Sequence, residues 1–354
     1  MDYGFYRRQA LENRQLARPP DPENRRLSMT EGSHQTDYAD GIPPLGPSCW
    51  FLTGPTASGK TRVGVELAGL LGAEIISLDS MALYRDMNIA TAKPSAEDRQ
   101  RIPHHLLDLV DPTEEFSLAD YLQAAHQAAG QIQAAGHAVL FVGGTPLYLK
   151  GLLHGISQGP PPDWDFREQV RQEVEQLGEQ QGSEVLHQRL ADVDPLSAHK
   201  LHRNDIRRII RALEVYKITG QPISHSQVHF EEQQSAGRHK VMALGWPRER
   251  LHERIEARVD QMFIDGLEDE ARGLLERYGE LSRTASQAVG YRELIAYRNE
   301  QVPRDEMVEQ VKRRTRQFAR RQETWFRSLQ ECHQVDQSDD IQPADMARQL
   351  LEMD

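Results

Sequence analysis

The stretch that decides the fold is Gly54-Pro55-Thr56-Ala57-Ser58-Gly59-Lys60-Thr61. It satisfies the pattern G-x-x-x-x-G-K-[ST], in which backbone amides and the N-terminus of the following helix hold phosphate oxygens. An apolar run at 49–53 precedes it, and helically spaced apolar residues follow it at 62–71. Strand, glycine-rich turn and helix thus come in the order that a phosphate-binding loop requires. In such a loop Lys60 adds positive charge at the terminal phosphate, and the Thr61 hydroxyl helps to hold Mg²⁺.

Working outward, short β-rich runs recur at 74–79, 106–110, 138–143 and 241–246, with helical stretches such as 117–135 between them. Strands that alternate with helices indicate a mostly parallel, doubly wound sheet. The predicted fold class is therefore α/β, with a P-loop NTPase-like parallel sheet core, an all-helical insertion and a helical C-terminal part.

Composition breaks divide the chain into five predicted segments. A stretch without hydrophobic periodicity ends in the Gly/Pro-rich run 41–47, and a second break, rich in Gly and Pro, falls at 159–163. The segments are a disordered extension (1–47), the first part of the P-loop core (48–158), a helical insertion (159–205), the core continuation with a helical C-terminal part (206–330) and a tail (331–354).

The overall composition is that of a globular enzyme. Hydrophobic residues make up 38% and charged residues 27%, which excludes the fibrous and disordered classes. Only Cys49 and Cys332 are present, without metal-ligand spacing, so neither a disulfide framework nor a zinc site is predicted. No apolar run approaches the roughly 20 residues that span a bilayer, and the first residues lack the apolar part of a secretory signal. We expect a cytoplasmic protein that does not associate with membranes.

The charge pattern bears on nucleic-acid binding. A net charge of −12 is unusual for such a protein, because Lys and Arg contacts to phosphate supply most of the affinity. Two stretches are nevertheless locally basic, at 200–217 and at 312–327. They can be solvated helix faces or parts of a basic groove, and the charge pattern alone leaves both interpretations open.

A carboxylate ends the second β-rich run, in Ile75-Ile76-Ser77-Leu78-Asp79-Ser80. Ligands of open α/β sheets bind at this carboxyl edge, so Asp79 is expected to face the phosphate loop. From its position Asp79 can equally be a Mg²⁺ ligand or a capping residue. The continuation 81–94, ending in Thr91-Ala92-Lys93-Pro94, resembles the bacterial and organellar tRNA dimethylallyltransferases.

The resemblance recurs in order from about 49 to 327, in six separate blocks. They are the phosphate loop with Asp79-Ser80; Pro103-His104-His105-Leu106-Leu107-Asp108; Val142-Gly143-Gly144-Thr145-Pro146-Leu147-Tyr148; 204–208 with 211–214; 254–262; and Gln287-Ala288-Val289-Gly290-Tyr291-Arg292. The histidine of the second block, His104, can be functional or structural.

For the chemistry, the resemblance implies transfer of a dimethylallyl group from dimethylallyl diphosphate to N6 of the adenosine at tRNA position 37, with Mg²⁺ as cofactor. Asp79 is then the candidate general base, since the N6 proton must leave as the C–N bond forms. Arg258 would stabilise the leaving diphosphate, and Arg254, one turn earlier, is its nearest substitute. Arg258 could instead be a solvated charge paired with Glu253 or Glu256. Thr145 would lie beside the aspartate or serve as a helix N-cap.

For RNA, Arg203, Arg207 and Arg211 recur at four-residue spacing, which would present guanidinium groups on one helix face. The resemblance implies that the insertion grips the anticodon stem-loop and that the target base is flipped out of its stack. A tight turn at Gly290 would bring backbone close to a base, with Gln287 and Arg292 available for edge contacts. The predicted tRNA-binding residues are Asp79, Ser80, Met81, Ala82, Arg207, Arg208, Ile209, Ile210, Arg211, Gln287, Ala288, Val289, Gly290, Tyr291 and Arg292.

Three other functions share some of these features. A small-molecule kinase would bind ATP in the same loop but does not explain the second basic cluster. An isopentenyltransferase acting on free adenine nucleotides shares fold and donor, and the basic insertion favours RNA over it. A P-loop RNA-binding protein without activity would not need the intact Lys60, Thr61 and Asp79. A monomer is expected.

Overall fold

A computed structural model describes residues 41–46, 49–157, 159–225, 239–299 and 303–353. Most of the predicted extension, 1–40 and 47, lies outside the described residues. Its end is ordered, contrary to the prediction for 1–47. Ile42 and Leu45 are buried, and Ile42 forms an antiparallel bridge with Ile156. Two apolar side chains in this Gly/Pro-rich run are enough to anchor it to the core.

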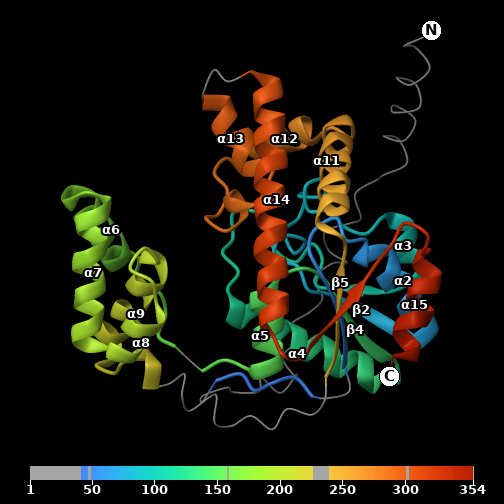
Figure 1. Cartoon of the computed structure of the whole chain (residues 1–354), viewed down its shortest axis with the longest axis horizontal. Helices are drawn as coiled ribbons and strands as arrows, with labels where there is room; N and C mark the ends of the chain where they lie inside the picture. Colours follow the sequence, from blue (N-terminus) through green and yellow to red (C-terminus); the bar gives the residue numbers. More distant parts are fainter. Residues whose placement is uncertain (1–40, 47–48, 158, 226–238, 300–302, 354) are drawn as a thin grey trace. The chain divides into compact units, whose positions relative to one another are not determined.

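The core is one parallel sheet with strand order β3-β2-β4-β1-β5-β6, shown in Figure 1. Its strands are β1 (Cys49–Thr53), β2 (Ala73–Ser77), β3 (His104–His105), β4 (Ala138–Val142), β5 (Lys240–Gly245) and β6 (Cys332–Asp336). The helices between them are α2 (Lys60–Leu71), α3 (Ala96–Arg101), α4 (Leu118–Ala134) and α5 (Pro146–His154), and α15 (Pro343–Glu352) ends the chain's described part. The predicted α/β class is confirmed.

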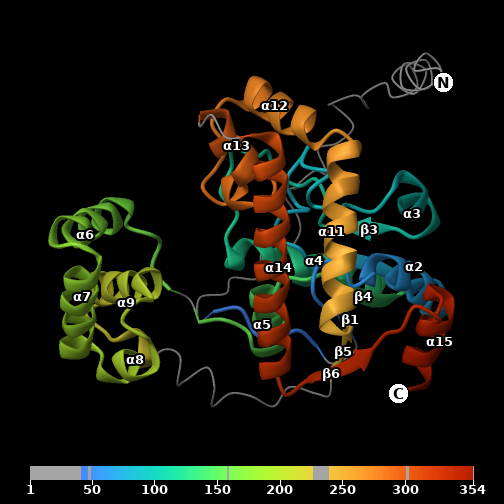
Figure 2. The same ribbon diagram turned by 45° about the horizontal axis from the view of Figure 1, so that its top comes forward.

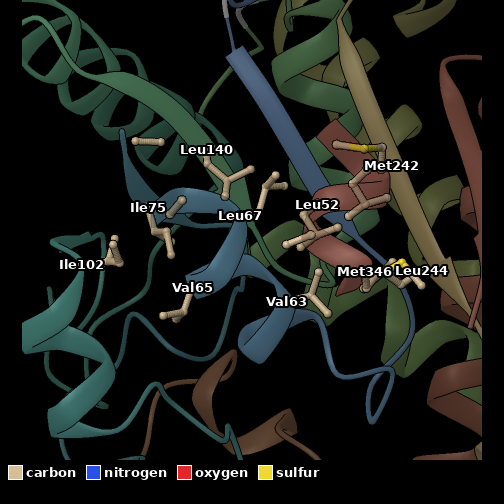
Figure 3. Packing of buried hydrophobic residues seen from close by; sticks show 14 of the residues in the cluster. Leu52, Val63, Val65, Leu67, Ile75, Ile102, Leu140, Met242, Leu244 and Met346 are labelled. Atoms are coloured by element: carbon tan, nitrogen blue, oxygen red, sulfur yellow. The ribbon is translucent and has the colours of Figure 1, made fainter. Parts of the chain in front are cut away.

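The central strands β1, β4 and β5 are largely apolar on both faces, as buried parallel strands are. On one face α2 and α15 cover a cluster that includes Leu52, Leu140, Met242 and Leu244, drawn in Figure 3. On the other, Phe51 stacks on Phe141 with ring centroids 4.9 Å apart. Burial on both faces fixes the sheet, and with it the edge where the strands end.

Two strand predictions need correction. The strand predicted at 106–110 is displaced, because pairing with β2 falls on His104 and His105, and in the predicted run only Val110 forms an isolated bridge, to Tyr84. The predicted tail 331–354 is instead part of the core. Strand β6 pairs along β5, and α15 packs on α2 through Met346, Ala347 and Leu350. Strand β6 was missed because its sequence is mostly polar: it lies at the edge of the sheet, where Val335 is its one buried residue.

The insertion is helical, as predicted for its sequence, but it extends beyond residue 205. Its helices are α6 (Trp164–Leu177), α7 (Glu179–Val193), α8 (Pro195–Lys200) and α9 (Ile206–Thr219). Ile209, Ile210 and Ala212 of α9 pack with Val170, Leu186 and Leu190 of α6 and α7 in one buried cluster. The predicted boundary at 205/206 therefore cuts through a single hydrophobic core.

The C-terminal part is helical as well, with α11 (Arg248–Ile264), α12 (Leu267–Tyr278), the 3₁₀ turn η2 (Ala285–Gln287), α13 (Tyr291–Asn299) and the long α14 (Arg304–Ser328). Helices α11 and α14 run side by side in both Figure 1 and Figure 2. In the part of the chain that the structure describes, no helix combines the length and apolar character needed to cross a membrane.

Candidate active site

The phosphate loop owes its shape to positions that only small residues can occupy. Gly54 has φ of 142°, and a Cβ there would lie 2.5 Å from the carbonyl oxygen of Leu244. Gly59 caps α2 at φ 90°, while Ala57 adopts φ 63°, which is unfavourable for a residue with a side chain. As described, α2 has neither a side-chain cap nor an acidic residue in its first turn. Its N-terminal amides and dipole are thus left to an anion.

Side chains from distant segments hold the loop from outside. The carbonyl of Ser58 accepts hydrogen bonds from Trp246 Nε1 at 3.0 Å and from Gln337 Nε2 at 2.7 Å. Arg254 donates from Nε to the carbonyl of Ala57 at 2.9 Å and stacks on the Trp246 ring. These contacts keep the left-handed Ala57 in place. Arg254 therefore supports the loop and is not the free guanidinium of the site.

Positive charge gathers at the inner side of the loop. Lys60 donates to the carbonyl of Pro55 at 3.1 Å. Burial and, secondarily, the charge of Arg258 lower the pKa of Lys60 to about 8, opposed by Asp79. Burial also lowers the pKa of Arg258, whose buried Nε has no hydrogen-bond partner among the described residues, like the buried hydroxyl of Ser58. Buried donors without acceptors are what a site for a multiply charged anion presents before binding.

Arg258 is not paired in the way the alternative interpretation required. Glu253 pairs with Arg250, and Glu256 pairs with Arg316 at 2.6 Å. Arg258 instead lies where the negative charge of Asp79 acts on it. Its guanidinium therefore remains available to a ligand.

Asp79, Ser80 and Thr145 meet at the carboxyl edge of β2 and β4. Asp79 Oδ1 accepts from the amides of Met81 at 2.8 Å and Ala82 at 3.2 Å, which fixes the carboxylate; its Oδ2 forms no hydrogen bond within the described chain. Thr145 occupies the N-cap of α5 without a capping bond, and its hydroxyl accepts from the Ser80 amide at 3.0 Å. Thr145 therefore stands at the N-cap position of α5, but its hydroxyl does not cap the helix. The hydroxyl instead binds the turn that carries Asp79.

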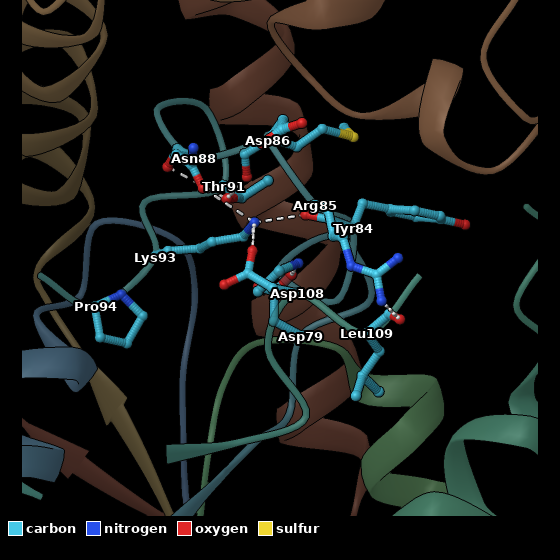
Figure 4. Close-up of polar contacts among 12 residues, drawn as sticks. Asp79, Tyr84, Arg85, Asp86, Asn88, Thr91, Lys93, Pro94, Asp108 and Leu109 are labelled. Atoms are coloured by element: carbon cyan, nitrogen blue, oxygen red, sulfur yellow. Dashed lines mark hydrogen bonds and ion pairs between the residues drawn. The ribbon is translucent and has the colours of Figure 1, made fainter. Parts of the chain in front are cut away.

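Segment 81–94 is held beside Asp79 by a polar network, shown in Figure 4. Lys93 bonds the carbonyl of Tyr84 at 2.5 Å and Asp108 at 2.6 Å, and Arg99 holds the other Asp108 oxygen at 2.8 Å. On the far side Glu270 of α12 accepts from the amides of Asn88 and Ile89 at 3.1 and 2.9 Å. Lys93 of the Thr-Ala-Lys-Pro ending therefore helps to hold segment 81–94 in its conformation.

One cavity of about 460 Å³ joins these elements. It is lined by the phosphate loop, by the Asp79 turn, by α11 and by α14, and also by His104 and by Arg207 of the insertion. His104 bonds the Ile102 carbonyl at 2.7 Å through Nδ1, and burial lowers its pKa, so it lines the cavity as a neutral ring. The predicted residues in the lining are Thr56, Lys60, Thr61, Asp79, Ser80, Met81, Ala82, Thr145, Arg207, Arg258, Gln287, Ala288 and Val289.

The remaining predicted tRNA-binding residues lie elsewhere. Ile209, Ile210 and Tyr291 are buried, and Tyr291 donates to Glu270, so they can support RNA-contacting neighbours but cannot touch RNA themselves. Arg211 is engaged by the fully buried Glu214 and by the Pro160 carbonyl. Arg208 pairs with Asp205, and Arg203 precedes α9 and pairs with Glu184. The predicted row of three guanidinium groups is therefore wrong, and Arg207 alone of the three faces the cavity.

The turn before α13 packs on segment 81–94. Gly290 has φ of 98°, and a Cβ there would lie 3.2 Å from Ala90. Its amide donates a hydrogen bond to Glu293 at 2.8 Å. Gln287 and Arg292, which lie beside this turn, are exposed. Gly290 thus allows the turn to pack closely on the side chain of Ala90.

Two functional glutamines escaped the sequence reasoning. Gln322 of α14 is buried and bonds both the phosphate loop and Gly144, and Gln337 after β6 bonds Ser58. No local pattern marks either of them, since their partners lie more than 170 residues away. Recognition of β6 as a core strand would have directed attention to Gln337.

The donor set also bears on a metal ion. No group of three or more His, Cys, Asp or Glu side chains in the described residues is arranged to hold one. The cavity offers the hydroxyl of Thr61 and the carboxylate of Asp79, both hard oxygen donors. These fit Mg²⁺, which keeps several waters and takes other ligands from phosphate.

Fold and site together define a P-loop protein whose phosphate loop and a fixed carboxylate line one cavity. Residues 82–329 match the family model described as IPP transferase, and residues 47–113 match a second described as isopentenyl transferase. The chain belongs to the IPP transferase family.

Relatives and solved structures agree with this membership. The tRNA dimethylallyltransferase of Rhodopirellula baltica is 46% identical over 306 residues, 84% of this chain and 90% of the relative, and that of Geobacter metallireducens 44% over 277 residues, 78% and 88%. The tRNA isopentenylpyrophosphate transferase of Bacillus halodurans is 36% identical with a TM-score of 0.62, over 87% of this chain and 94% of that one. A eukaryotic dimethylallyltransferase acting on tRNA is 28% identical with a TM-score of 0.65, over 82% and 74%.

Proposed function

We propose that this protein transfers a dimethylallyl group from dimethylallyl diphosphate to N6 of the adenosine at tRNA position 37, next to the anticodon. Diphosphate is the second product. The observation that carries the proposal is the single cavity in which the phosphate loop, Arg258 and the Asp79–Thr145 centre meet. A binding site for a diphosphate anion and a proton acceptor thus lie in one cavity.

In this mechanism the C1–O bond of the donor breaks and its electron pair leaves with the diphosphate. The loop amides, Lys60 and Arg258 stabilise the negative charge that grows on the leaving group. N6 supplies the electron pair of the new C1–N6 bond, and its proton passes to Asp79. The hydrogen bonds from the amides of Met81 and Ala82 to Oδ1 fix the position of this carboxylate, and Oδ2 receives the proton.

Mg²⁺ would be bound through Thr61 and diphosphate oxygens, with Asp79 near enough to contribute. When bound, it neutralises charge on the diphosphate and so makes it a better leaving group. The predicted protein ligand is Thr61, and magnesium remains the expected ion because the donor set is hard oxygen.

The RNA is proposed to lie at Arg207 and Gln287, which line the cavity, and at the exposed Arg292 beside Gln287. Trp164 supports this placement, since it is a large apolar residue that stays 47% exposed. Arg167 and Arg283 lie over its ring at 4.8 and 5.4 Å from the centroid. An exposed aromatic ring flanked by guanidinium groups is the chemistry that holds unstacked bases and their phosphates. The flipped adenine would then reach Asp79 within the cavity.

The proposal is tested by incubating the purified chain with unmodified tRNA, dimethylallyl diphosphate and Mg²⁺. Mass spectrometry of the digested nucleosides should show N6-(dimethylallyl)adenosine, confined to fragments that contain position 37. A parallel reaction with AMP, ADP or ATP as acceptor tests the free-nucleotide alternative. Product only on free nucleotides, or ATP-dependent phosphorylation with unchanged tRNA, would contradict the proposal. Sedimentation of the same sample checks the predicted monomer.

A further inference from the structure

Gln322 is a buried amide between the two halves of the active site. Only 3% of the residue is exposed, although Gln322 lines the cavity together with its neighbour Arg321 on α14. Its Oε1 accepts a hydrogen bond from the Thr56 amide at 2.8 Å, and its Nε2 donates to the carbonyl of Gly144. Each end of the amide thus holds a backbone group, one on either side of the cavity.

The two backbone groups that Gln322 joins belong to different chemical tasks. Thr56 is part of the phosphate loop, which holds the leaving group. Gly144 precedes Thr145, whose hydroxyl accepts from Ser80 beside the general base Asp79. One side chain therefore spans from the diphosphate side of the cavity to the acceptor side.

The surroundings of Gln322 are built for this bridge. A Cβ on Gly144 would lie 2.6 Å from Nε2, so glycine is needed for the amide to approach. The neighbouring Gly143 accepts from the buried Thr53 hydroxyl at 2.9 Å, and a Cβ there would lie 2.2 Å from the Leu78 carbonyl oxygen. Gln322 is therefore a direct link between the phosphate loop and the closely packed turn that leads to Thr145.

A planar amide is suited to this task because it donates at one end and accepts at the other. Glutamate can accept from Thr56 but cannot donate to Gly144 while ionised, and methionine of similar length cannot donate and accepts only weakly. The bridge therefore requires a side chain with one donor and one acceptor, and similar length is not sufficient.

We propose that Gln322 is a positioning residue that sets the distance between the diphosphate-bearing carbon and the N6 nucleophile. The inference rests on the proposed function, in which C1–O cleavage and C1–N6 formation require both partners at near-contact distance. Displacement of reacting groups by about 1 Å can cost about 10²-fold in rate. Loss of the bridge should accordingly slow the chemical step more than it weakens either substrate's binding.

The test compares Gln322→Met and Gln322→Glu with the parent in single-turnover reactions at saturating tRNA and dimethylallyl diphosphate. Gln322→Met should lower the rate by about 30- to 100-fold, while the Kd of each substrate, measured by calorimetry, changes less than about threefold. Gln322→Glu keeps the Thr56 contact and should fall between Met and the parent. Gln317→Met, an exposed position on the same helix, is the matched control and should react at the parental rate.

The outcomes separate this inference from the proposed function. A parent chain that prenylates no tRNA contradicts the proposed function and the bridge together. An active parent with an equally fast Gln322→Met contradicts the bridge alone. Loss of rate matched by an equal loss of donor affinity would overturn it as well, since Gln322 would then shape only the phosphate loop. Should Gln322→Met not fold, as thermal melting would reveal, Gln322→Glu carries the same comparison.

Discussion

In the phosphate loop, backbone carbonyls are held by Trp246 and Gln337, which follow β5 and β6, and by Arg254 of α11, whereas most ion pairs of the helical insertion lie at the surface. Ser58 receives two side-chain donors from residues 188 and 279 positions away. Insertion pairs such as Arg171–Glu168 join neighbours on one helix and lie at the surface. Distant, buried contacts fix a geometry, and exposed pairs contribute little and exchange easily with a charged partner. We therefore expect the chemistry to depend on the pre-organised part and the RNA affinity on the adaptable one.

The sharpest way to break this comparison is Asp79→Asn. Asparagine keeps an oxygen for the amides of Met81 and Ala82 but cannot take up the N6 proton at neutral pH. Loss of a positioned base costs about 10²- to 10⁴-fold in rate, so the single-turnover rate should fall in this range. The Kd for tRNA should rise by no more than about tenfold, near 1.4 kcal/mol. A mutant with native circular dichroism and the parental rate would remove Asp79 from the mechanism.

Arg258→Gln should come next in size. The guanidinium acts on charge that develops as diphosphate leaves, and removal of one such donor typically costs about 10²- to 10³-fold in kcat. Arg254→Gln, one helical turn earlier, is the matched comparison, because Arg254 supports the loop through Ala57. It should raise the KM for the donor and lower kcat much less. Similar kcat losses in both variants would mean that the two arginines share one role.

How much of this was readable in the sequence follows the range of the interactions. The motif 54–61 and the β-rich runs around it predicted the parallel sheet, because local periodicity and glycine positions determine those elements. Asp79, Thr145 and Arg258 were predicted from strand ends and the family resemblance, and the structure brings them to one cavity. Gln322 was not predicted, because its contacts cross more than 170 residues of chain.

The wrong prediction for Arg211 in the insertion also has a contact outside the local pattern as its cause. A four-residue spacing places Arg207 and Arg211 on one helix face, but it says nothing of what else covers that face. Glu214, itself fully buried, requires two guanidinium partners and takes both Arg167 and Arg211. A buried acid in another part of the helix thus decides the role of a predicted phosphate ligand.

The pH dependence of donor binding gives a smaller effect. With a pKa of about 8, Lys60 is charged below pH 8 in the free protein and loses its proton above it. Diphosphate binds the charged form, so donor affinity should be full near pH 7 and fall by about tenfold near pH 9. Lys60→Gln should remove this part of the profile, and the donor's own titration, common to both proteins, cancels in their ratio. A constant ratio between pH 7 and 9 would contradict the assignment.

The smallest expected effect distinguishes Arg207 from Arg211, two arginines one turn apart on α9. Arg207 is exposed at the cavity and forms no ion pair with a described residue, so it is free to contact phosphate. Arg207→Gln should weaken tRNA binding about fivefold and reduce the slope of log K against log salt by about one. Donor affinity should not change, because the phosphate loop is untouched.

Arg211→Gln should behave in the opposite way. It removes one of two guanidinium groups from buried Glu214, which remains bonded to Arg167 at 2.6 and 2.7 Å. The loss should lower the free energy of unfolding by about 1.5–3 kcal/mol, the usual worth of a hydrogen bond to a charged group. The salt slope of tRNA binding should stay parental at temperatures where the insertion is folded. Filter binding across salt concentrations and thermal melting, applied to both variants, measure the two quantities. If Arg211→Gln lowered the salt slope as much as Arg207→Gln without loss of stability, both arginines would contact RNA and the division between fixed and adaptable charges would not hold within α9.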